Sequence, residues 1–318
     1  MKSKKIIALL LATLVLASAF PAAASQDDEK KKDEPPPQGK PVLWRDPGDV
    51  SQLDLLAGPG GELKPDLTKL TFIREEKGGY SKKYRVRDAA GRVWVAKIGK
   101  EAQPETAAVR LIWAAGYVSE INHLAPKATI EGKGTFENVR FEARPEGVKR
   151  LDEWQWEFNP FAGRRELQGL KALMALMENW DLKDANNRVL YVEEKGELHH
   201  VVSDLGATFG KTGGQYSPMK LLRSVKGSRN EPGDYVGDKF IDGIEAGRLR
   251  FNYGGKNSEM MRDVTVESAK WVGSILAKLS DQQIEDAFRA ANYSPEEVKM
   301  LAAAVRSRIN ELVALPER

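Results

Sequence analysis

The feature that most restricts the fold is a polar loop at residues 179–187, Asn-Trp-Asp-Leu-Lys-Asp-Ala-Asn-Asn, which lies between two apolar segments. Residues 167–177 precede the loop and carry leucines and methionines at helical spacing. Residues 189–192, Val-Leu-Tyr-Val, follow it and form a short apolar run that is typical of a strand. We therefore expect a helix to end, a loop rich in carboxylates and carboxamides to follow, and a strand to begin.

A second strand candidate at residues 201–206, Val-Val-Ser-Asp-Leu-Gly, ends in a carboxylate and a glycine. Two consecutive strands form a hairpin, which brings the start of the first strand close to the end of the second. Because Asp181 and Asn186 precede the first strand and Asp204 ends the second, the three side chains are expected to face one point. Hard divalent cations take oxygen ligands, so this grouping suits a cation that carries phosphates.

Composition excludes several other kinds of site. The chain has 318 residues, enough for one two-lobed domain or two small ones, and it contains no cysteine. This excludes disulfides, zinc sites with thiolate ligands and cysteine nucleophiles. Only three histidines are present. Two of them, His199 and His200, are adjacent in a predicted strand and would face opposite sides of it, so a shared metal site is not expected.

Residues 1–24 have the composition of a cleavable secretory signal, with three lysines near the start, an apolar run at residues 6–20 and three alanines at residues 22–24. The apolar run is short for a membrane span, so no span is expected after cleavage. Cleavage would remove three of the 49 basic residues and leave 46, which equals the 46 acidic residues. We therefore predict an exported protein, periplasmic or secreted, without a charge signal for a nucleic-acid partner.

The rest of the chain divides by composition. Residues 25–68 are predicted to form a disordered spacer and then an irregular arm, because residues 26–41 are charged and rich in proline. A charged recognition tail is the alternative interpretation of this stretch. Residues 69–145 are predicted to be β-rich and residues 146–318 mainly helical, which gives an α+β fold class.

Turn glycines and capping residues locate the expected elements. In the β-rich part, strands are expected at residues 70–74, 83–87, 93–98, 128–130 and 139–143. A helix is expected to begin at Pro104 and to end near Ala115, just before Gly116. In the helical part, a helix is expected over residues 164–178, whereas residues 207–256 are rich in glycine and carry no usable signal. Two capping boxes mark later helices: Ser280 with Gln283, and Ser294 with Glu297.

Lys97 lies between apolar neighbours in the strand expected at residues 93–98. A lysine in the middle of a strand usually points to solvent, and this is the simplest interpretation. The alternative is that Lys97 points inward and neutralises phosphate, held by an ion pair with Glu105 in the first turn of the next helix. Glu101 is nearer in the sequence and is a second candidate for that ion pair.

The order of four motifs resembles that of protein kinase-like folds. The motifs are a lysine in the strand Val-Ala-Lys-Ile at 95–98, a helix with Glu105, Asp-Leu-Lys-Asp-Ala-Asn at 181–186 and Asp-Leu-Gly at 204–206. The resemblance covers roughly residues 69–290 and implies a nucleotide between a β-rich lobe and a helical lobe. It also implies ATP with Mg²⁺ or Mn²⁺ and an acceptor hydroxyl, and the sequence does not identify the substrate that carries it.

The resemblance assigns roles to residues, following the physics of phosphoryl transfer. Lys97 would contact the non-terminal phosphates of the nucleotide. Asp181 would orient the accepting hydroxyl and take its proton, and Lys183 would steady the transferred phosphoryl group. Asn186 and Asp204 would hold the metal ions.

Three departures separate the chain from typical protein kinases. Asn179 and Trp180 stand where a histidine and an arginine usually precede the catalytic aspartate, which is closer to atypical kinases such as the HipA-type and secreted kinases. The glycine-rich loop is reduced to Gly78, Gly79, Tyr80 and Ser81, whose backbone amides would cradle phosphate. No Ala-Pro-Glu motif follows Asp204, which argues against a eukaryotic-type activation segment.

Other interpretations stay open at the level of sequence. Asp184, Asn186 and Asn187 are also common helix-end and turn residues, because their side chains bind nearby backbone groups. A kinase-like scaffold also serves as a non-catalytic binding module, a pseudokinase, or transfers a nucleotidyl group instead of a phosphoryl group. Trp154 and Trp156 share one face of an extended stretch, where core packing is the simpler interpretation than a ligand cleft.

Overall fold

The computed structural model describes residues 35–79, 81–213 and 227–317. The predicted signal at residues 1–24 lies outside the described residues, as does most of the predicted spacer. The chain divides into residues 1–35 and 36–318, and the elements below all belong to the second unit. Among the described residues, none of the helices combines the length and the apolar character that a membrane crossing needs.

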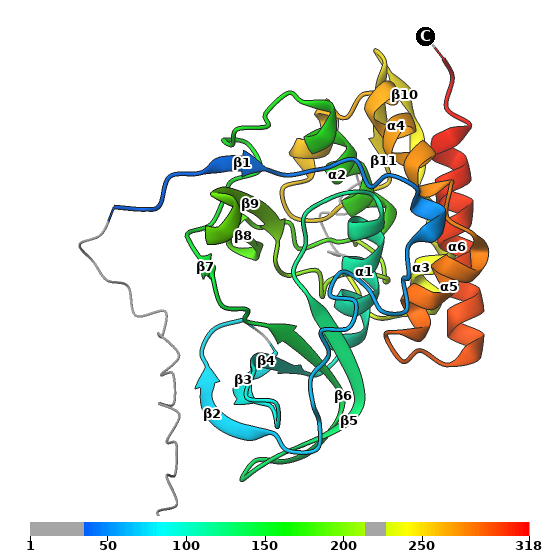
Figure 1. Ribbon diagram of the computed structural model, residues 1–318. Coiled ribbons are helices and arrows are strands. Elements are labelled where there is room, and N and C mark those ends of the chain that lie inside the picture. The colour runs from blue at the N-terminus through cyan, green and yellow to red at the C-terminus, as the bar shows by residue number, and fades with distance from the viewer. Residues whose placement is uncertain (1–34, 80, 214–226, 318) are drawn as a thin grey trace, which may run out of the picture. The chain divides into compact units, whose positions relative to one another are not determined.

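A five-stranded antiparallel sheet occupies the first half of this unit, with strand order β2-β3-β4-β6-β5 (Figure 1). Its strands are β2 (Thr71–Glu76), β3 (Lys82–Arg87), β4 (Val93–Ile98), β5 (Asn122–Ile130) and β6 (Gly134–Ala143). Helix α1 (Ala102–Ala114) connects β4 to β5 and packs against β5 and β6. All five strands were expected from the sequence, although β5 begins six residues earlier than predicted because polar residues and Pro126 interrupt its alternation.

The two faces of this sheet differ in chemistry. One face carries an apolar cluster, including Tyr84, Val86, Trp94, Ala96 and Phe141. The other face carries three basic residues side by side on neighbouring strands. In the register of the sheet, Lys97 on β4 stands opposite Lys83 on β3 and opposite Arg140 on β6. Like charges in such positions repel, so this face needs carboxylates from elsewhere in the chain.

A second sheet has the strand order β1-β9-β8-β7. Its strands are β1 (Lys40–Val42), β7 (Val148–Arg150), β8 (Asn187–Val192) and β9 (Glu197–Val202). The pair β8–β9 is the predicted hairpin, joined by the 3-10 turn η3 (Glu193–Lys195), while β1 runs parallel to β9. Lys40 and Pro41, which fall in the predicted disordered spacer, therefore pair with β9.

The arm that follows β1 packs on the body of the protein at Gly116. It includes the 3-10 turn η1 (Val50–Gln52). Gly116 has a φ of +91°, and a Cβ placed on it would lie 2.3 Å from the carbonyl oxygen of Arg45. The glycine that ends α1 thus permits the close approach of this arm.

The remaining elements are mainly helical. They are α2 (Arg165–Leu176), α3 (Pro232–Gly237), α4 (Val266–Leu276), α5 (Asp281–Arg289), α6 (Pro295–Val313), the hairpin β10 (Ile241–Glu245) with β11 (Arg248–Phe251), and the 3-10 turns η2 (Asp184–Asn186) and η5 (Ser258–Asp263). Both predicted capping boxes are present, at Ser280 before α5 and at Ser294 before α6. The predicted α+β fold class is confirmed, and Figure 1 shows the five-stranded sheet apart from the C-terminal helices.

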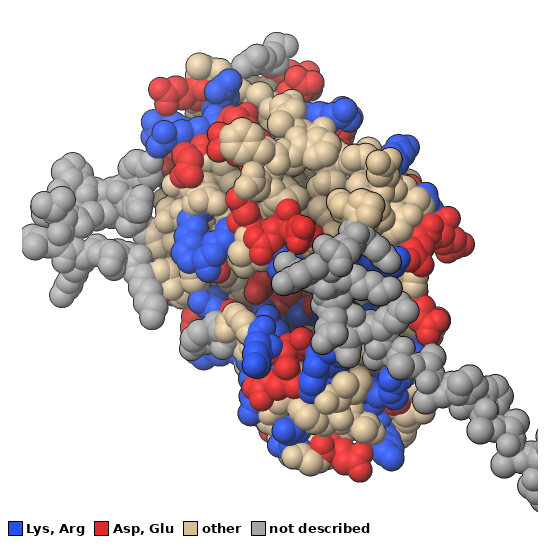
Figure 2. Space-filling model, turned by 90° about the vertical axis from the view of Figure 1, so that its left-hand side faces the viewer, with Lys and Arg blue, Asp and Glu red and all other residues tan. Residues whose placement is uncertain are grey.

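Charge is mixed over the surface of the protein. Figure 2 shows lysine and arginine side chains interspersed with aspartate and glutamate side chains on one face. The formal net charge of the full chain is +3 at pH 7. A field of one sign, which would attract a polyanion, is therefore not evident on the face drawn.

Candidate active site

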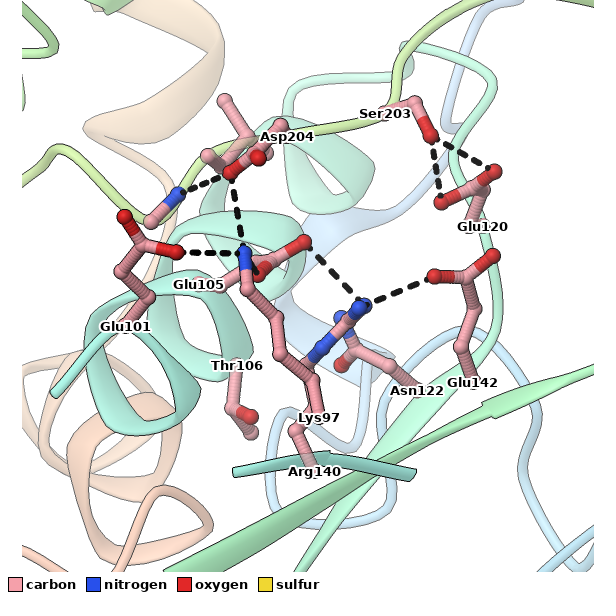
Figure 3. Close-up of polar contacts among 12 residues, drawn as sticks. Lys97, Glu101, Glu105, Thr106, Glu120, Asn122, Arg140, Glu142, Ser203 and Asp204 are labelled. Atoms are coloured by element: carbon pink, nitrogen blue, oxygen red, sulfur yellow. Dashed lines mark hydrogen bonds and ion pairs between the residues drawn. The ribbon is translucent and has the colours of Figure 1, made fainter. Parts of the chain in front are cut away.

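Lys97 points into the protein and binds three carboxylates. Its side chain is 1% exposed, and its Nζ lies 2.9 Å from Glu105 Oε2 and 3.1 Å from Asp204 Oδ1 (Figure 3). Nζ also lies 3.0 Å from Glu101 Oε2. The inward interpretation of this strand lysine is therefore correct. Both candidate glutamates bind it, and they do not exclude one another.

The short connection from β4 to α1 explains why both glutamates reach Lys97. Glu101 is the N-cap residue of α1 and Glu105 lies in its first turn, so the two side chains stand one turn apart on one face. Carboxylates are also stabilised at a helix N-terminus by the partial positive charge there. The helix starts at Ala102, two residues before Pro104 where its start was expected, and this places Glu101 at the helix end.

The carboxylates keep Lys97 charged. Burial would lower the pKa of Lys97, but the nearby charges of Glu105 and Asp204 outweigh burial and raise it above its usual value. Burial also acts on Asp204, where the charge of Lys97 and a hydrogen bond from the Gly206 amide outweigh it and lower the pKa. Lys97 and Asp204 are therefore an ionised pair at neutral pH.

A chain of ion pairs continues from this cluster across the sheet. Arg140 Nη1 lies 3.1 Å from Glu105 Oε1, and Arg140 Nη2 lies 2.9 Å from Glu142 Oε2 (Figure 3). Glu142 also pairs with Arg144 and, at 3.2 Å, with Arg150. The buried face of the sheet thus alternates basic and acidic side chains, which offsets the repulsion between its opposed cations.

The chain of ion pairs returns to its starting point through Ser203. Arg150 pairs with Glu120 and donates a 2.8 Å hydrogen bond to Ser203 Oγ. Ser203 Oγ donates in turn to Glu120, with oxygen–oxygen distances of 3.0 and 3.1 Å (Figure 3). Since Ser203 precedes Asp204 in the chain, the contacts form a closed ring that starts and ends at the Asp-Leu-Gly segment.

The loop at 179–187 leaves α2 through a tight helix end. The amide of Glu178 donates to Ala175 O at 3.0 Å and the amide of Asn179 donates to Met174 O at 2.9 Å, which is the Schellman pattern. Glu178 takes the left-handed position of this motif with a φ of +53°. Its carboxylate is buried against Arg308 of α6, so α6 secures the turn that leads into the loop.

Asp181 is held by two lysines. Lys183 Nζ donates to Asp181 Oδ2 at 3.0 Å, and Lys256 Nζ lies 2.9 Å from Oδ1. Burial would raise the pKa of Asp181, but hydrogen bonds from Lys256 and Lys183 outweigh it and lower the pKa. The carboxylate is therefore ionised at neutral pH and fixed on both of its oxygens.

Asn186 connects Asp181 to Asp204. Its Nδ2 donates to Asp181 O at 2.5 Å and approaches Asp181 Oδ2 at 3.4 Å. The backbone carbonyl of Asn186 accepts from the amides of Ser203 at 2.8 Å and Asp204 at 3.1 Å. Asn186 thus contacts both Asp181 and Asp204, with its side chain toward Asp181 and its backbone carbonyl toward Asp204, and Lys97 joins this group through Asp204.

The donor set fits a hard divalent cation. Among the described residues, Asn186 Oδ1 and Asp204 Oδ2 accept no hydrogen bond and pair with no cation. A carboxylate and an amide oxygen suit Mg²⁺ or Mn²⁺, which keep several waters and take further ligands from phosphates. Within the described ranges no three histidine, aspartate or glutamate side chains gather into a cluster that could hold a metal by itself.

The reduced glycine-rich loop reaches the site at one residue. Ser81 Oγ donates to Glu101 Oε2 at 2.5 Å, so Ser81 is joined to the Lys97 cluster. Gly78 and Gly79 have φ angles of +98° and +77°, in the left-handed region that glycine favours. Tyr80, between them and Ser81, lies outside the described residues.

Two lysines of the site were missed in the sequence. Lys256 lies in the glycine-rich region that carried no signal, and its amide donates to Trp180 O at 2.8 Å. Lys83 stands opposite Lys97 on β3, and its charge helps to lower the pKa of Asp204. The register of β3 and β4 would have placed Lys83 beside Lys97, whereas no local pattern marks Lys256.

The tryptophan and histidine side chains that were considered as alternative sites contact neighbouring side chains. The indoles of Trp154 and Trp156 are buried 4.8 Å apart, edge to face, in the main core, as expected. His199 lies beside Glu197, whereas the ring of His200 packs against Phe161.

Comparisons with known proteins find similarity in structure but not in sequence. No known family model and no characterised protein sequence matches the chain. The structure is similar to that of a proinflammatory kinase of Helicobacter pylori, CtkA, with 9% sequence identity and a TM-score of 0.46 over 79% of this chain and 94% of that one. It is also similar to the Golgi casein kinase, with 8% identity and a TM-score of 0.39 over 79% of this chain and 71% of that one.

Proposed function

We propose that the chain is an exported, kinase-like phosphotransferase that moves a phosphoryl group from ATP to a hydroxyl of an acceptor substrate. The observation that carries the proposal is the buried ion-paired Lys97, joined by Asp204 and Asn186 to the backbone carbonyl and, at 3.4 Å, to the carboxylate of Asp181. A buried lysine that is fixed by carboxylates, one of them the proposed metal ligand Asp204, suits a metal-bound polyphosphate.

Each residue of the cluster has a distinct part in this reaction. Glu105 holds Lys97 so that its Nζ can bind the non-terminal phosphates. Asn186 Oδ1 and Asp204 Oδ2 would hold Mg²⁺ or Mn²⁺, which when bound supplies charge neutralisation on the phosphate oxygens. Lys83 adds a second positive charge on the same face of the sheet.

Asp181 acts on the accepting hydroxyl. Its ionised carboxylate accepts a hydrogen bond from that hydroxyl and takes the proton as the new oxygen–phosphorus bond forms and the bond to the diphosphate oxygen breaks. Lys183 and Lys256 keep the carboxylate in one orientation, which counts because catalysis here depends on positioning and electrostatics. Lys183, which is 46% exposed, would also contact the transferred group.

A label-transfer experiment tests the reaction. Wild type and Asp181→Ala are incubated with Mn²⁺ and ATP labelled at the γ- or the α-phosphate, together with a generic protein acceptor and the chain itself. We expect label from the γ-position in wild type and at least a hundredfold less in the variant. Label from the α-position would identify nucleotidyl transfer instead. Nucleotide binding without transfer from either position would favour the non-catalytic binding module.

Export is a separate part of the proposal and has its own test. Residues 1–30 are fused to an alkaline phosphatase reporter that folds only where disulfides form. Reporter activity in the periplasm supports the predicted signal. Equal activity of a reporter without residues 1–30 contradicts it.

A further inference from the structure

A cavity of about 550 Å³ lies between the arm that follows β1, the loop that follows α1 and the segment from β6 to β8, and its wall shares Glu120, Arg144 and Arg150 with the network of ion pairs. Its wall includes none of Lys97, Asp181, Asn186 and Asp204. The volume falls in the range of sites that hold drug-sized ligands. The cavity is therefore large enough for a small organic molecule and separate from the proposed nucleotide site.

The wall of this cavity combines apolar and basic side chains. The apolar part includes Trp113, Tyr117, Val148, Leu190 and Val192. The charged side chains on the wall are four bases, Arg45, Arg144, Arg150 and Lys195, and two acids, Asp46 and Glu120. Three of these bases already form ion pairs, Arg45 with Glu197, Arg144 with Glu142 and Arg150 with Glu120. A ligand with an apolar body and a negative end therefore depends on donors that these pairs leave unused.

Arg144, on the cavity wall, has hydrogen-bond donors to spare. Its Nη1 binds Glu142 and Ala143 O, its side chain is 19% exposed, and its Nη2 donates to no described group. Its Nε is buried and likewise has no partner among the described residues. A guanidinium only donates hydrogen bonds, so the group that would satisfy it is an acceptor such as a carboxylate, sulfonate or phosphate.

We propose that this cavity binds a small organic anion whose apolar body packs on Val148, Leu190 and Val192 and whose acidic group binds Arg144. The bound acid would lie at the outer end of the ion-pair chain, because Arg144 shares Glu142 with Arg140. The inner end of that chain is Lys97. The site is independent of phosphotransfer, and its test does not require catalytic activity.

A pair of fluorescent probes with similar bodies tests the proposal on the full chain. The anionic probe is 8-anilinonaphthalene-1-sulfonate and the neutral probe is N-phenyl-1-naphthylamine. We expect one anionic probe to bind per chain and to be displaced by octanoate far more effectively than by 1-octanol. This comparison uses wild type alone, and the absence of saturable binding, or equal displacement by both competitors, overturns the proposal.

Variants then locate the probe. Val192→Trp and Val148→Trp fill the cavity from two partly exposed positions, and each should weaken both probes at least tenfold. Arg144→Met should weaken the anionic probe at least tenfold and the neutral probe less than twofold. Phe158→Ser, at an exposed aromatic outside the cavity, is the control and should change neither. Unchanged binding in both tryptophan variants, with native near-ultraviolet circular dichroism, or equal weakening of both probes by Arg144→Met, overturns the proposal.

Discussion

At the scale of single residues, the site depends on how buried charges compensate one another. Lys97 stands between two other cations on the sheet, and it is tolerated in the interior because Glu101, Glu105 and Asp204 surround it. A buried charge without partners costs several kcal/mol, so the carboxylates are required for the fold as well as for any ligand.

Lys256 should set the acid limb of the pH–activity profile. In Lys256→Met, Asp181 loses one of the two hydrogen bonds that lower its pKa, so its pKa rises and the activity should be lost at higher pH than in wild type. Lys256→Arg should keep the wild-type profile in large part. The measurement is kcat/KM for the labelled transfer between about pH 5 and about pH 9.

Lys239→Met serves as the control for this change. Lys239 pairs with Asp242 and makes no contact with the described residues of the site, so its removal should leave the profile unchanged. An acid limb that stays in place in Lys256→Met would contradict the role given to this lysine.

His123 should make the protein less stable in mild acid. Burial, together with the charge of Arg110, lowers the pKa of His123 from 6.5 to about 4. Below pH 6.5 His123 is therefore protonated in the unfolded chain but not in the folded chain. The free energy of unfolding falls as the pH is lowered, until His123 is also protonated in the folded chain at about pH 4. At about pH 5 this amounts to about 2 kcal/mol, from about 1.4 kcal/mol per pH unit.

The test compares urea unfolding of wild type and His123→Gln at about pH 7.5 and about pH 5. The loss of stability on acidification should be smaller in the variant by roughly that amount. Equal losses in the two proteins would show that His123 does not titrate below its ordinary pKa.

At the scale of elements, the end of α2 and the middle of α6 act together. Arg308 Nη1 donates to Leu176 O at 2.8 Å, and its Nη2 binds the buried carboxylate of Glu178 and Tyr235 O. These contacts fix the turn from which the 179–187 loop departs. A helix near the C-terminus thereby positions Asp181 without contacting it.

Burial raises the pKa of Glu178 to about 8 even beside Arg308, so the loss of Arg308 removes hydrogen bonds more than it exposes a charge. Arg308→Leu should destabilise the protein by about 1–3 kcal/mol for each buried acceptor left without its donor, at Leu176 O, Tyr235 O and Glu178. Arg306→Leu, two residues earlier on α6, is the matched control. Arg306 pairs with Asp281, whose side chain is 79% exposed, so its loss should cost about 1 kcal/mol or less. The urea midpoints report both values, and similar small losses in the two variants would contradict the buried-pair account.

Local signals account for the elements that the sequence predicted. The strands of the first sheet alternate and end at turn glycines, and the capping boxes at Ser280 and Ser294 involve residues three apart. The hairpin of β10 and β11 gave no such signal. The left-handed end of α2 was also hidden, because its position is filled by Glu178, where glycine is the usual residue.

At the scale of the whole molecule, the contacts that the sequence did not predict are those between distant segments. β1 pairs with β9 through backbone hydrogen bonds, which neither strand's residue pattern predicts. Lys256 reaches Asp181 through a parallel bridge between two loops. In contrast, Asp181, Asn186 and Asp204 were predictable together, because they flank two strands with local patterns and the hairpin β8–β9 brings those ends together. The inward direction of Lys97 was left open by its strand and was favoured only by the resemblance.

The ring of ion pairs connects the two sheets. Arg140 and Glu142 lie on β6, Arg150 lies on β7, and Ser203 follows β9. The ring therefore holds the Asp-Leu-Gly segment against the sheet that carries Lys97. Because the ring is closed, the position of Asp204 depends on both sheets and not on one loop alone.

The measurement that tests the central claim most directly is calorimetric titration of ATP into the protein with and without Mn²⁺, for wild type, Lys97→Met and Asp204→Asn. We predict one nucleotide per wild-type chain with an affinity that Mn²⁺ raises at least tenfold, strongly weakened binding in Lys97→Met, and loss of the Mn²⁺ dependence in Asp204→Asn. Folded variants that bind ATP with wild-type affinity and wild-type dependence on Mn²⁺, or a wild-type protein that binds no nucleotide, would contradict the account.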